Sequence, residues 1–336
     1  MQQQTVLILG ARGRFGSAAA TAFAAAGWKV LAQRRSLGRP GAPAADANPA
    51  IRWLDVDVHD TAALTVQARR AAVVVHAMNP VYTDAAWRRE APAQMQAAIA
   101  ISKALGALLM FPGNVYNFGA TMPGVLREDT PQHPSTPKGQ VRVAVEQQLR
   151  DAAQQGLHSV VVRAGDFFGS GTGSLFDRVL VPKLARGRMG YPAGLQVRTA
   201  WAFVPDLACT FVQLAQRRGQ LQGAQVLHFR GHHLTGQDWL DALAPVAGAR
   251  GWLAPGASLS VNPLPWLLIR ALGLVIPTWA SLVQTRYIWN TPHALDNGRL
   301  QALIGAEPHT PLALAAQQAL ADLGMSGGTA PALRAA

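Results

Sequence analysis

The sequence predicts an α/β protein with a doubly wound parallel sheet and a smaller lobe toward the C-terminus. Short apolar runs alternate with helical patterns over about the first 165 residues, which is the order expected of a parallel sheet covered by helices on both faces. After Arg163 this alternation stops, and glycine and aromatic residues become frequent. We therefore expect a sheet domain at 1–165, a lobe interleaved with it at 166–324 and a flexible tail at 325–336.

The individual elements follow from local patterns. Short runs rich in apolar and β-branched residues predict buried strands at 5–9, 28–32, 51–54, 72–77, 107–111 and 159–163. Longer patterns between them predict helices at 13–26, 61–70, 85–105 and 137–153. The stretch 36–49 contains Gly, Pro and Asn and predicts a loop. In the lobe we expect a strand at 225–229 and helices near 237–244 and 264–272.

Composition excludes several classes of protein. Hydrophobic residues make up 49% of the 336 residues and charged residues 14%, which excludes global disorder. The net charge is +12, but the cations are scattered, so we expect no nucleic-acid partner. Cys209 is the only cysteine, which excludes an internal disulfide and favours the cytoplasm. No Cys/His spacing predicts a metal site.

The two most apolar regions do not predict membrane insertion. The N-terminus lacks a basic segment before its short apolar run, so it does not resemble a signal peptide. The stretch 261–283 is interrupted by three prolines and Arg270, so we do not expect a spanning helix there. A helix that contacts a membrane surface stays a less favoured alternative.

A glycine motif follows the first strand, where residues 10–16 read GARGRFG. Gly10 permits a tight turn, Gly13 lets the backbone approach a pyrophosphate, and Gly16 lets the helix pack closely on the sheet. The free N–H groups of the helix N-terminus then face the phosphates. The motif and its context predict a Rossmann-type dinucleotide site that includes Arg14 and Phe15.

The end of the second strand indicates which dinucleotide is bound. Arg34 and Arg35 stand there without a carboxylate that would bind a ribose 2′-hydroxyl, and Arg12 lies in the neighbouring turn. Guanidinium groups suit a 2′-phosphate. The sequence therefore predicts NADP(H) in preference to NAD(H). The alternative is that Arg34 and Arg35 are ordinary solvated cations.

Together with five further segments, the glycine motif makes residues 5–245 resemble the extended short-chain dehydrogenase/reductase superfamily. Within it, the resemblance is to the NAD-dependent epimerase/dehydratase-like group. The segments that carry the resemblance, besides the glycine motif, are Asp57-Val58, His76-Ala77, Val115-Tyr116, RAGDFFG at 163–169 and FVPDLA at 203–208. The resemblance implies that Asp57 and Val58 flank the adenine and that Ala77 and Met78 line the cofactor. A capping role for Asp57 and core packing for Ala77 and Met78 are the alternatives.

The catalytic positions depart from the family pattern. Pro112 stands where the family has a Ser or Thr, Lys138 where it has the catalytic Tyr, and Arg142 where it has the Lys. We expect Lys138 to handle a proton, because a desolvated ammonium has a lowered pKa. Arg142 would bind the nicotinamide ribose. The alternative is a solvated Lys138 and an Arg142 paired with Glu146.

Three polar residues near the carboxyl ends of strands are further candidates. Asn114 and Tyr116 follow the fifth strand, where open α/β sheets bind ligands. Asn114 can polarise a carbonyl group, and Tyr116 offers a phenol, although packing beneath the sheet edge is an alternative for Tyr116. Asp166 follows the sixth strand and either points into the same crevice or serves the turn.

These observations predict an NADP(H)-dependent oxidoreductase or epimerase/dehydratase-like enzyme that acts on a carbonyl or alcohol carbon of a small molecule. The C-terminal lobe would bind this substrate, and the family resemblance allows a homodimer. The lost Ser and Tyr hydroxyls leave a second hypothesis, a non-catalytic NADP(H)-binding sensor. The apolar stretch 264–283 and the positive charge leave a third, a membrane-associated reductase of a lipid-like substrate.

Overall fold

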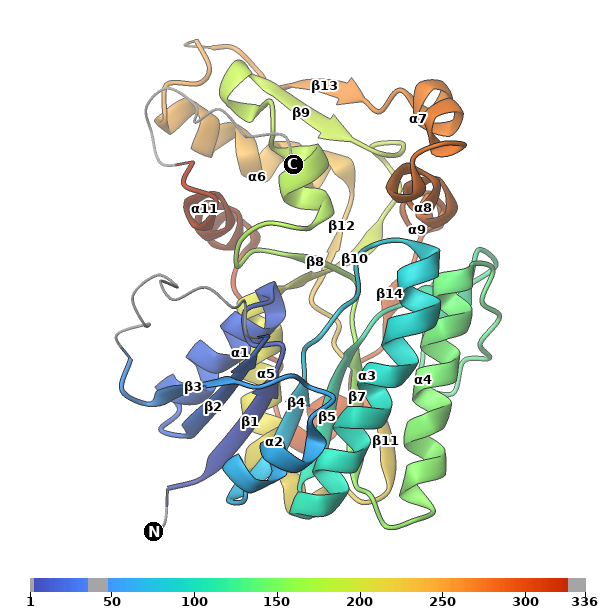
Figure 1. The fold of residues 1–336 in the computed structure, drawn as a ribbon. Helices are drawn as coiled ribbons and strands as arrows, with labels where there is room; N and C mark the ends of the chain where they lie inside the picture. Colours follow the sequence, from blue (N-terminus) through green and yellow to red (C-terminus); the bar gives the residue numbers. More distant parts are fainter. Residues whose placement is uncertain (1–2, 36–47, 255, 326–336) are drawn as a thin grey trace.

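A seven-stranded parallel sheet forms the centre of the molecule (Figure 1). The computed structural model describes residues 3–35, 48–254 and 256–325. The strand order is β11-β7-β5-β4-β1-β2-β3, and all neighbouring pairs are parallel. The strands are β1 (Thr5–Leu9), β2 (Lys29–Arg34), β3 (Ile51–Asp55), β4 (Ala71–His76), β5 (Leu108–Gly113), β7 (Ser159–Arg163) and β11 (Ala224–His228). The predicted Rossmann-type fold is confirmed.

The seventh strand is the main difference from the sequence prediction. A strand near 225–229 was expected in the small lobe, but β11 pairs with β7 at the edge of the large sheet. Its apolar pattern gives the strand but carries no information about its partner, because pairing is set by the tertiary fold. The large sheet therefore draws on chain well beyond residue 165.

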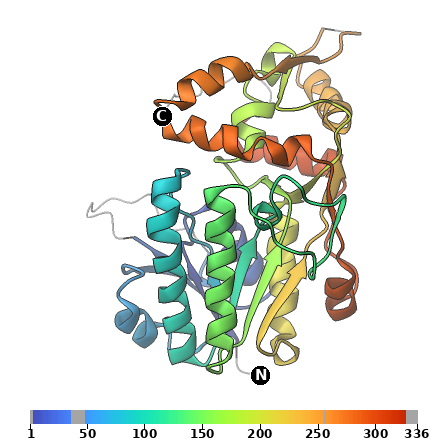
Figure 2. The same ribbon diagram turned by 90° about the vertical axis from the view of Figure 1, so that its right-hand side faces the viewer.

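Helices cover both faces of this sheet (Figure 2). One face packs against α1 (Arg14–Ala25), α5 (Val204–Gln216) and α10 (Gly298–Ile304). The other packs against α2 (Thr61–Gln67), α3 (Asp84–Leu105) and α4 (Pro137–Ala153). Side chains of β1 alternate between the two cores, since successive residues of a strand point to opposite faces.

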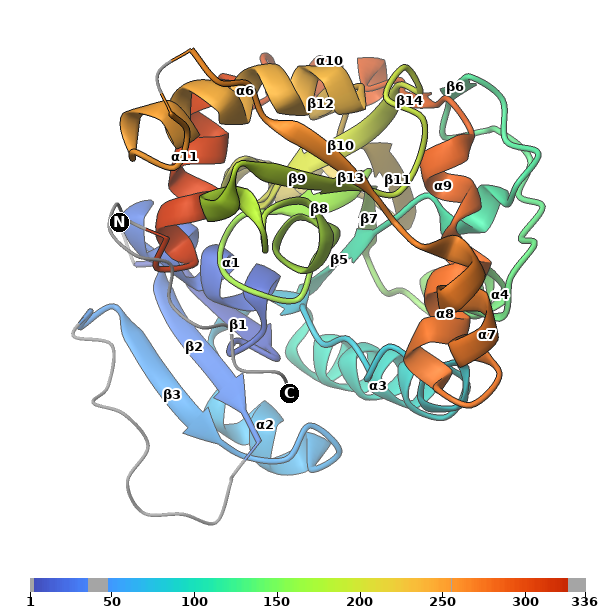
Figure 3. The same ribbon diagram turned by 90° about the horizontal axis from the view of Figure 1, so that it is seen from above.

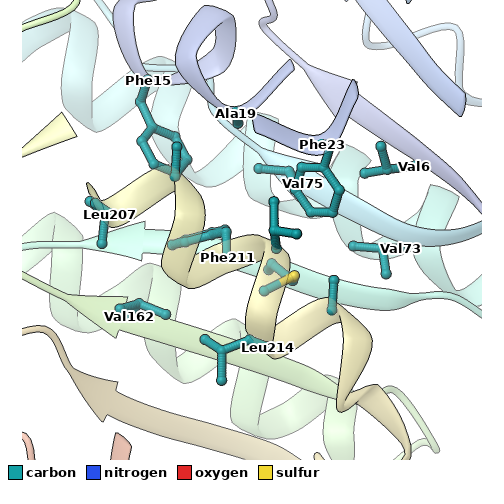
Figure 4. Close-up of a cluster of buried hydrophobic side chains, with 14 of the residues drawn as sticks. Val6, Phe15, Ala19, Phe23, Val73, Val75, Val162, Leu207, Phe211 and Leu214 are labelled. Carbon is teal, nitrogen blue, oxygen red and sulfur yellow. The ribbon is translucent and has the colours of Figure 1, made fainter. Parts of the chain in front are cut away.

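The contact between α1 and α5 fixes the position of the glycine motif (Figure 4). Phe15 of α1 lies edge-on to Phe211 of α5, with ring centroids 4.8 Å apart. Phe23 and Leu214 extend this buried layer over Val73 and the other strands. Burial of these side chains holds the start of α1 against the sheet, because each buried aromatic contributes a large apolar area.

A smaller lobe lies over the carboxyl ends of the strands (Figures 1 and 3). Its three-stranded sheet has the order β12-β10-β8, and a second sheet pairs β13 with β9. The strands are β8 (Asp166–Phe168), β9 (Arg188–Tyr191), β10 (Thr199–Phe203), β12 (His232–Leu234) and β13 (Ser260–Pro263). The helices are α6 (Gly236–Ala249), α7 (Trp266–Gly273), α8 (Pro277–Thr285), α9 (Tyr287–Asn290) and α11 (Leu312–Asp322).

Short elements complete the chain. The strands β6 (Val125–Leu126) and β14 (Ala294–Leu295) pair with each other, and single helical turns lie at Tyr116–Phe118, Phe176–Leu180, Leu184–Arg186 and Arg218–Gln220. Most of the predicted loop at 36–49 and of the predicted tail at 325–336 lies outside the described residues. Among the helices that the structure describes, none is both long and apolar enough to cross a bilayer.

Candidate active site

The glycine motif forms a closely packed turn between β1 and α1. Gly10 has a φ of +76°, and a Cβ added to it would lie 2.7 Å from Cγ of Met78. A Cβ on Gly16 would lie 2.4 Å from the Gly10 carbonyl oxygen. Both contacts are shorter than real Cβ atoms show, and the φ of Gly10 is one that L-residues rarely adopt. The turn therefore excludes larger residues, as a dinucleotide cradle requires.

The turn also provides an anion-binding helix end. Gly13 is the N-cap of α1 in extended conformation, and its carbonyl accepts the N–H of Ser17. The N–H groups of the first turn, at 14–16, precede the intrahelical hydrogen bonds and are available to phosphate oxygens. The Ala77 carbonyl lies 3.7 Å from the position of a Cβ on Gly13. The structure thus brings Ala77 and Met78 beside the glycine turn, and a dinucleotide fits these residues.

Two side chains of the motif point away from this cradle. Arg14 donates from Nη1 to the Phe167 carbonyl at 3.0 Å, and burial lowers the pKa of its guanidinium. Phe15 packs in the core against Phe211. Arg14 and Phe15 can therefore bind a phosphate only through their backbone N–H groups. The role of these two residues in cofactor binding stays a prediction.

The end of β2 differs from the expectation in one respect. No carboxylate was expected there, but Asp55 of β3 lies beside Arg34 and accepts from its Nε at 2.5 Å and from its Nη2 at 3.0 Å. Residues that face each other on neighbouring strands come from distant positions, which explains the omission. Arg12 and Arg35 are exposed. Arg34 lowers the pKa of Asp55 most, and the charge of Arg12 lowers it further.

Asp57 and Val58 occupy the loop after β3. The Asp57 Oδ1 accepts the backbone N–H of His59 at 2.8 Å, and Asp60 caps α2 through Ala63. Val58 is buried in the core on the α2 face of the sheet. The loop role considered as the alternative for Asp57 is therefore present in the structure. Contacts of Asp57 and Val58 with an adenine stay a prediction.

Lys138 is held in a buried polar contact. Thr136 caps α4 with Pro137 at its first position, as the sequence predicts. The ammonium of Lys138 donates to Asp84 Oδ1 at 2.5 Å and to Ser281 Oγ at 2.6 Å, and it lies 4.6 Å from the Tyr82 ring centroid. Burial lowers its pKa, and the ion pair with Asp84 opposes this shift. The expected solvated alternative is wrong, since Lys138 has no exposed side-chain surface.

Arg142 lies one turn further along α4 and is partly buried. Its guanidinium carbon lies 4.9 Å from the Trp87 ring centroid and 5.0 Å from that of Phe111. In the described part of the chain its Nε has no hydrogen-bond partner. It lines a small cavity that Met78 and His76 also line, next to the glycine turn. This unpartnered donor beside the glycine turn could bind a hydroxyl of the nicotinamide ribose. Ribose binding by Arg142 stays a prediction.

Glu146 does not pair with Arg142, so this expected alternative is wrong. Its carboxylate instead accepts from Nη2 of Arg163 at 2.6 Å and from Nε at 3.2 Å. Asn117 donates to the same carboxylate at 3.0 Å. Both partners of the ion pair are only 1% exposed. This pair joins α4 to β7 beneath the site.

Tyr116 lies at the carboxyl end of β5 and contacts a second tyrosine. Its hydroxyl lies 2.9 Å from that of Tyr82, which precedes α3. Burial raises the pKa of the Tyr116 phenol well above its usual value, and Tyr82 and Asp166 raise it further. Asn114 accepts the backbone N–H of Tyr116 at 3.1 Å and so stabilises this turn. The two phenols are protonated at neutral pH and can donate a hydrogen bond to a substrate oxygen.

Asp166 is the acidic group of this region. It is partly buried, and the indole Nε1 of Trp289 donates to its Oδ2. Burial raises the pKa of Asp166 to about 6, against the opposing effects of Trp289 and Arg14. Its charge also raises the pKa values of Tyr82, Tyr116 and Tyr287, so these groups share one electrostatic environment. A carboxyl group that titrates near neutrality is suited to exchange a proton.

Sequence reasoning missed Tyr82 and Trp289 as members of this site. Tyr82 follows the Met78 segment after β4, and that position at a carboxyl strand end was an available signal. Trp289 comes from α9, more than 100 residues away from Asp166 in the chain. No local pattern predicts this contact.

His76 is buried, and burial lowers its pKa to about 3. Its Nδ1 accepts the backbone N–H of Met78 at 3.3 Å.

The fold and the glycine turn define a Rossmann-type protein with a cradle for a nicotinamide dinucleotide. The chain belongs to the NAD dependent epimerase/dehydratase family, whose sequence profile matches residues 6–226. The resemblance derived from the sequence is therefore confirmed. No curated protein matches the chain in sequence.

Solved structures of two sugar-nucleotide epimerases and of one further enzyme share the fold. UDP-glucose 4-epimerase from Brucella ovis, in complex with NAD, is 17% identical with a TM-score of 0.72, covering 96% of this chain and 98% of its own. The Bordetella bronchiseptica enzyme WbmH, in complex with NAD+, is 19% identical with a TM-score of 0.68 and coverages of 96% and 98%. The UDP-Glc/GlcNAc 4-epimerase from Campylobacter jejuni is 15% identical with a TM-score of 0.70 and coverages of 96% and 100%.

Proposed function

We propose that this protein is a nicotinamide-dinucleotide-dependent oxidoreductase or epimerase that acts on a carbonyl or alcohol carbon of a small molecule. One observation carries the proposal. The glycine cradle and the Tyr116–Tyr82–Asp166 group lie at the carboxyl edge of the same sheet, where ligands bind in open α/β folds. The neighbours named as UDP-glucose 4-epimerases make a nucleotide-linked sugar one substrate class to test first.

The proposed roles follow from the protonation states. A nicotinamide dinucleotide held by the glycine turn would supply or accept the hydride. Tyr116, which stays protonated, donates a hydrogen bond to the substrate oxygen, and Tyr82 orients this phenol. Asp166 takes up the hydroxyl proton during oxidation and returns it during reduction, because its pKa of about 6 permits both states. Arg142 binds the nicotinamide ribose, and Asn114 positions the Tyr116 turn.

Lys138 receives a different proposed role from the one its sequence position implies. Its ammonium is already bound by Asp84 and Ser281, so it joins the starts of α3 and α4 to α8 of the lobe. We propose that Lys138 is a positioning residue for the cleft, and that the proton passes through Asp166. Turnover by a Lys138→Met variant with an unchanged pH profile supports this; a lost ionisation in that profile contradicts it.

Replacement of Tyr116 with phenylalanine tests the proposed enzyme. We expect roughly 100-fold lower turnover, because a positioned acid or hydrogen-bond donor typically contributes a factor of this size. Cofactor affinity, measured by calorimetry with NADPH, NADP+, NADH and NAD+, should not change. Tyr191→Phe is the matched control, since Tyr191 is a buried phenol of the lobe outside the Tyr116–Tyr82 contact.

The alternative is a non-catalytic sensor of the cofactor's redox state. It is favoured by the loss of the family's Ser and Tyr hydroxyls at Pro112 and Lys138. A sensor binds one redox form much more tightly than the other and consumes no substrate. Stoichiometric oxidation or reduction of the cofactor with any carbonyl or alcohol substrate removes this alternative.

We also propose that NADP(H) is preferred over NAD(H). Arg34 binds the carboxylate of Asp55 at the end of β2, and the charge of Arg12 also lowers the pKa of Asp55. Arg35 follows Arg34 in the chain and is exposed. Gln33 does not offer its side chain to a ribose, because it accepts from the Gly10 N–H and donates to the Val56 carbonyl. Two of the solved neighbours are described in complex with NAD or NAD+. Calorimetric titration with NADPH and NADH tests the preference proposed for this chain.

The Asp55→Asn variant gives a specific expectation for this preference. Loss of the carboxylate frees Arg34 for a 2′-phosphate and removes a repelling charge, so NADPH should bind about tenfold more tightly while NADH changes little. Asp60→Asn, in the next loop, is the control. Equal changes for NADPH and NADH would contradict a phosphate site at Arg34.

A further inference from the structure

The helical hairpin α7–α8 exposes a cluster of large apolar side chains. Leu267 and Leu268 lie on α7, and Leu274 and Val275 lie in the turn before α8; we call these four residues the hairpin tip. Leu267 is 85% exposed and Leu274 87%. The other highly exposed large apolar residues in the described chain are scattered singly, at Val66, Val81, Val125 and Leu314. Single exposed apolar residues are ordinary, whereas a cluster indicates a contact surface.

The hairpin itself carries arginines and no carboxylate. Residues 242–295 contain no Asp or Glu, although they include Arg250, Arg270 and Arg286. Arg270 lies on α7 itself and is exposed. Apolar side chains flanked by arginines and free of carboxylates are typical of surfaces that enter the headgroup region of an anionic bilayer. The net charge of +12 favours the same partner.

The shape of this region fits a bilayer surface better than a protein groove. Figures 1 and 3 show α7 and α8 side by side at the outer edge of the lobe, over the ends of α3 and α4. Short helices that are separated by a tight turn and project their apolar residues outward can insert to headgroup depth without crossing the membrane. None of the described helices is long enough to span it.

The inner side of the same hairpin is joined to the candidate active site. Ser281 accepts from Lys138 at 2.6 Å, and Gln284 donates to Asp84 at 3.0 Å. Thr285 lies 3.4 Å from the hydroxyl of Tyr82. A surface bound by the tip would therefore lie within one helix of the Tyr82–Tyr116 contact.

We propose that the hairpin tip binds the surface of an anionic lipid bilayer. Leu267, Leu268, Leu274 and Val275 enter the headgroup layer, and Arg270 contacts anionic headgroups. This binding does not depend on turnover, so it is tested separately from the proposed function.

The test is flotation of the purified full chain with vesicles of phosphatidylcholine alone and of phosphatidylcholine mixed with phosphatidylglycerol. We expect binding to the mixed vesicles, and roughly tenfold weaker binding for Leu267→Ser/Leu274→Ser, since affinity follows buried apolar area. Val66→Ser/Leu314→Ser is the matched control, because it removes exposed apolar side chains from α2 and α11, outside the tip, and should bind normally. Arg270→Glu should weaken binding to the anionic vesicles.

Three outcomes would overturn the proposal. The first is that the wild-type chain stays in the supernatant with both kinds of vesicle. The second is that the tip variant and the control bind equally well, which would place the contact elsewhere. The third is a concentration-dependent dimer, measured by sedimentation, that the tip variant loses; the tip would then bind a second copy of the chain. The substituted tip residues are largely exposed, so unchanged thermal unfolding should verify that every variant folds.

Discussion

Replacing Asp166 with asparagine should raise the free energy of unfolding at pH 7.5 by up to about 3 kcal/mol. Burial raises the pKa of Asp166 from 3.8 to about 6, so the folded state binds its proton more tightly than the unfolded state does. The stability that this carboxyl contributes is fully present below about pH 4 and is lost as the pH rises to 6. An amide can still accept from Trp289 without carrying a poorly solvated charge.

The pH dependence distinguishes this cause from improved packing. Denaturant unfolding of the wild type and of Asp166→Asn should give the largest difference above pH 6.5 and a difference near zero at pH 4. The control is Asp177→Asn, whose carboxylate accepts the N–H groups of Gly173 and Ser174. A stabilisation by Asp166→Asn that is independent of pH would contradict the assigned ionisation.

The same variant should lose activity if Asp166 exchanges the substrate proton. We expect kcat/KM of the wild type for alcohol oxidation to rise with pH to a plateau above about pH 6, because the deprotonated carboxylate is the base. Asp166→Asn should lower the plateau by roughly 100-fold and remove this limb. Stability and activity would then change in opposite directions at one residue, which is typical of functional sites.

Removing Glu146 should have the largest destabilising effect of the changes considered. Glu146→Leu leaves the Arg163 guanidinium buried without a carboxylate, which typically costs about 3–5 kcal/mol. The uncompensated charge would also lie beside His228, whose pKa burial and Arg163 already lower to about 4. Denaturant titration at pH 7.5 measures this loss.

Two further variants control for the loss of the Glu146 side chain itself. Glu90→Leu removes one partner of an exposed ion pair with Arg89 and should cost less than about 1 kcal/mol. The double variant Glu146→Leu/Arg163→Met removes both buried charges and should be more stable than Glu146→Leu alone. If the double variant is the less stable of the two, the buried charge is not the cause.

Patterns within a few residues predicted much of the fold. Apolar runs gave the first six strands of the large sheet within a few residues, and Thr136 with Pro137 gave the start of α4. Strand membership was not available in this way. The apolar run at 225–229 predicted a strand, which the structure has at 224–228, but its place beside β7 depends on packing between distant segments.

The candidate site was predictable where a single segment carries it. The glycine turn depends on the local requirements of its own backbone, so spacing alone identified it. Lys138 was harder, because its partners Asp84 and Ser281 come from α3 and α8. Asp55 beside Arg34 was missed for the same reason. Residue type predicts what a side chain can do, and only the folded chain shows which partner it has.

The position of α5 and β11 in the chain has a consequence for synthesis on the ribosome. On the face of the sheet that carries α1, the part beside α1 is covered by Phe211 and Leu214 of α5. This part stays uncovered until residues 204–228 have emerged. A nascent chain that ends near residue 165 would carry this face and an unpaired β7 edge, both of which promote aggregation. Early release or nicking of the chain within the lobe would therefore leave a fragment that chaperones must hold, not a working cofactor domain.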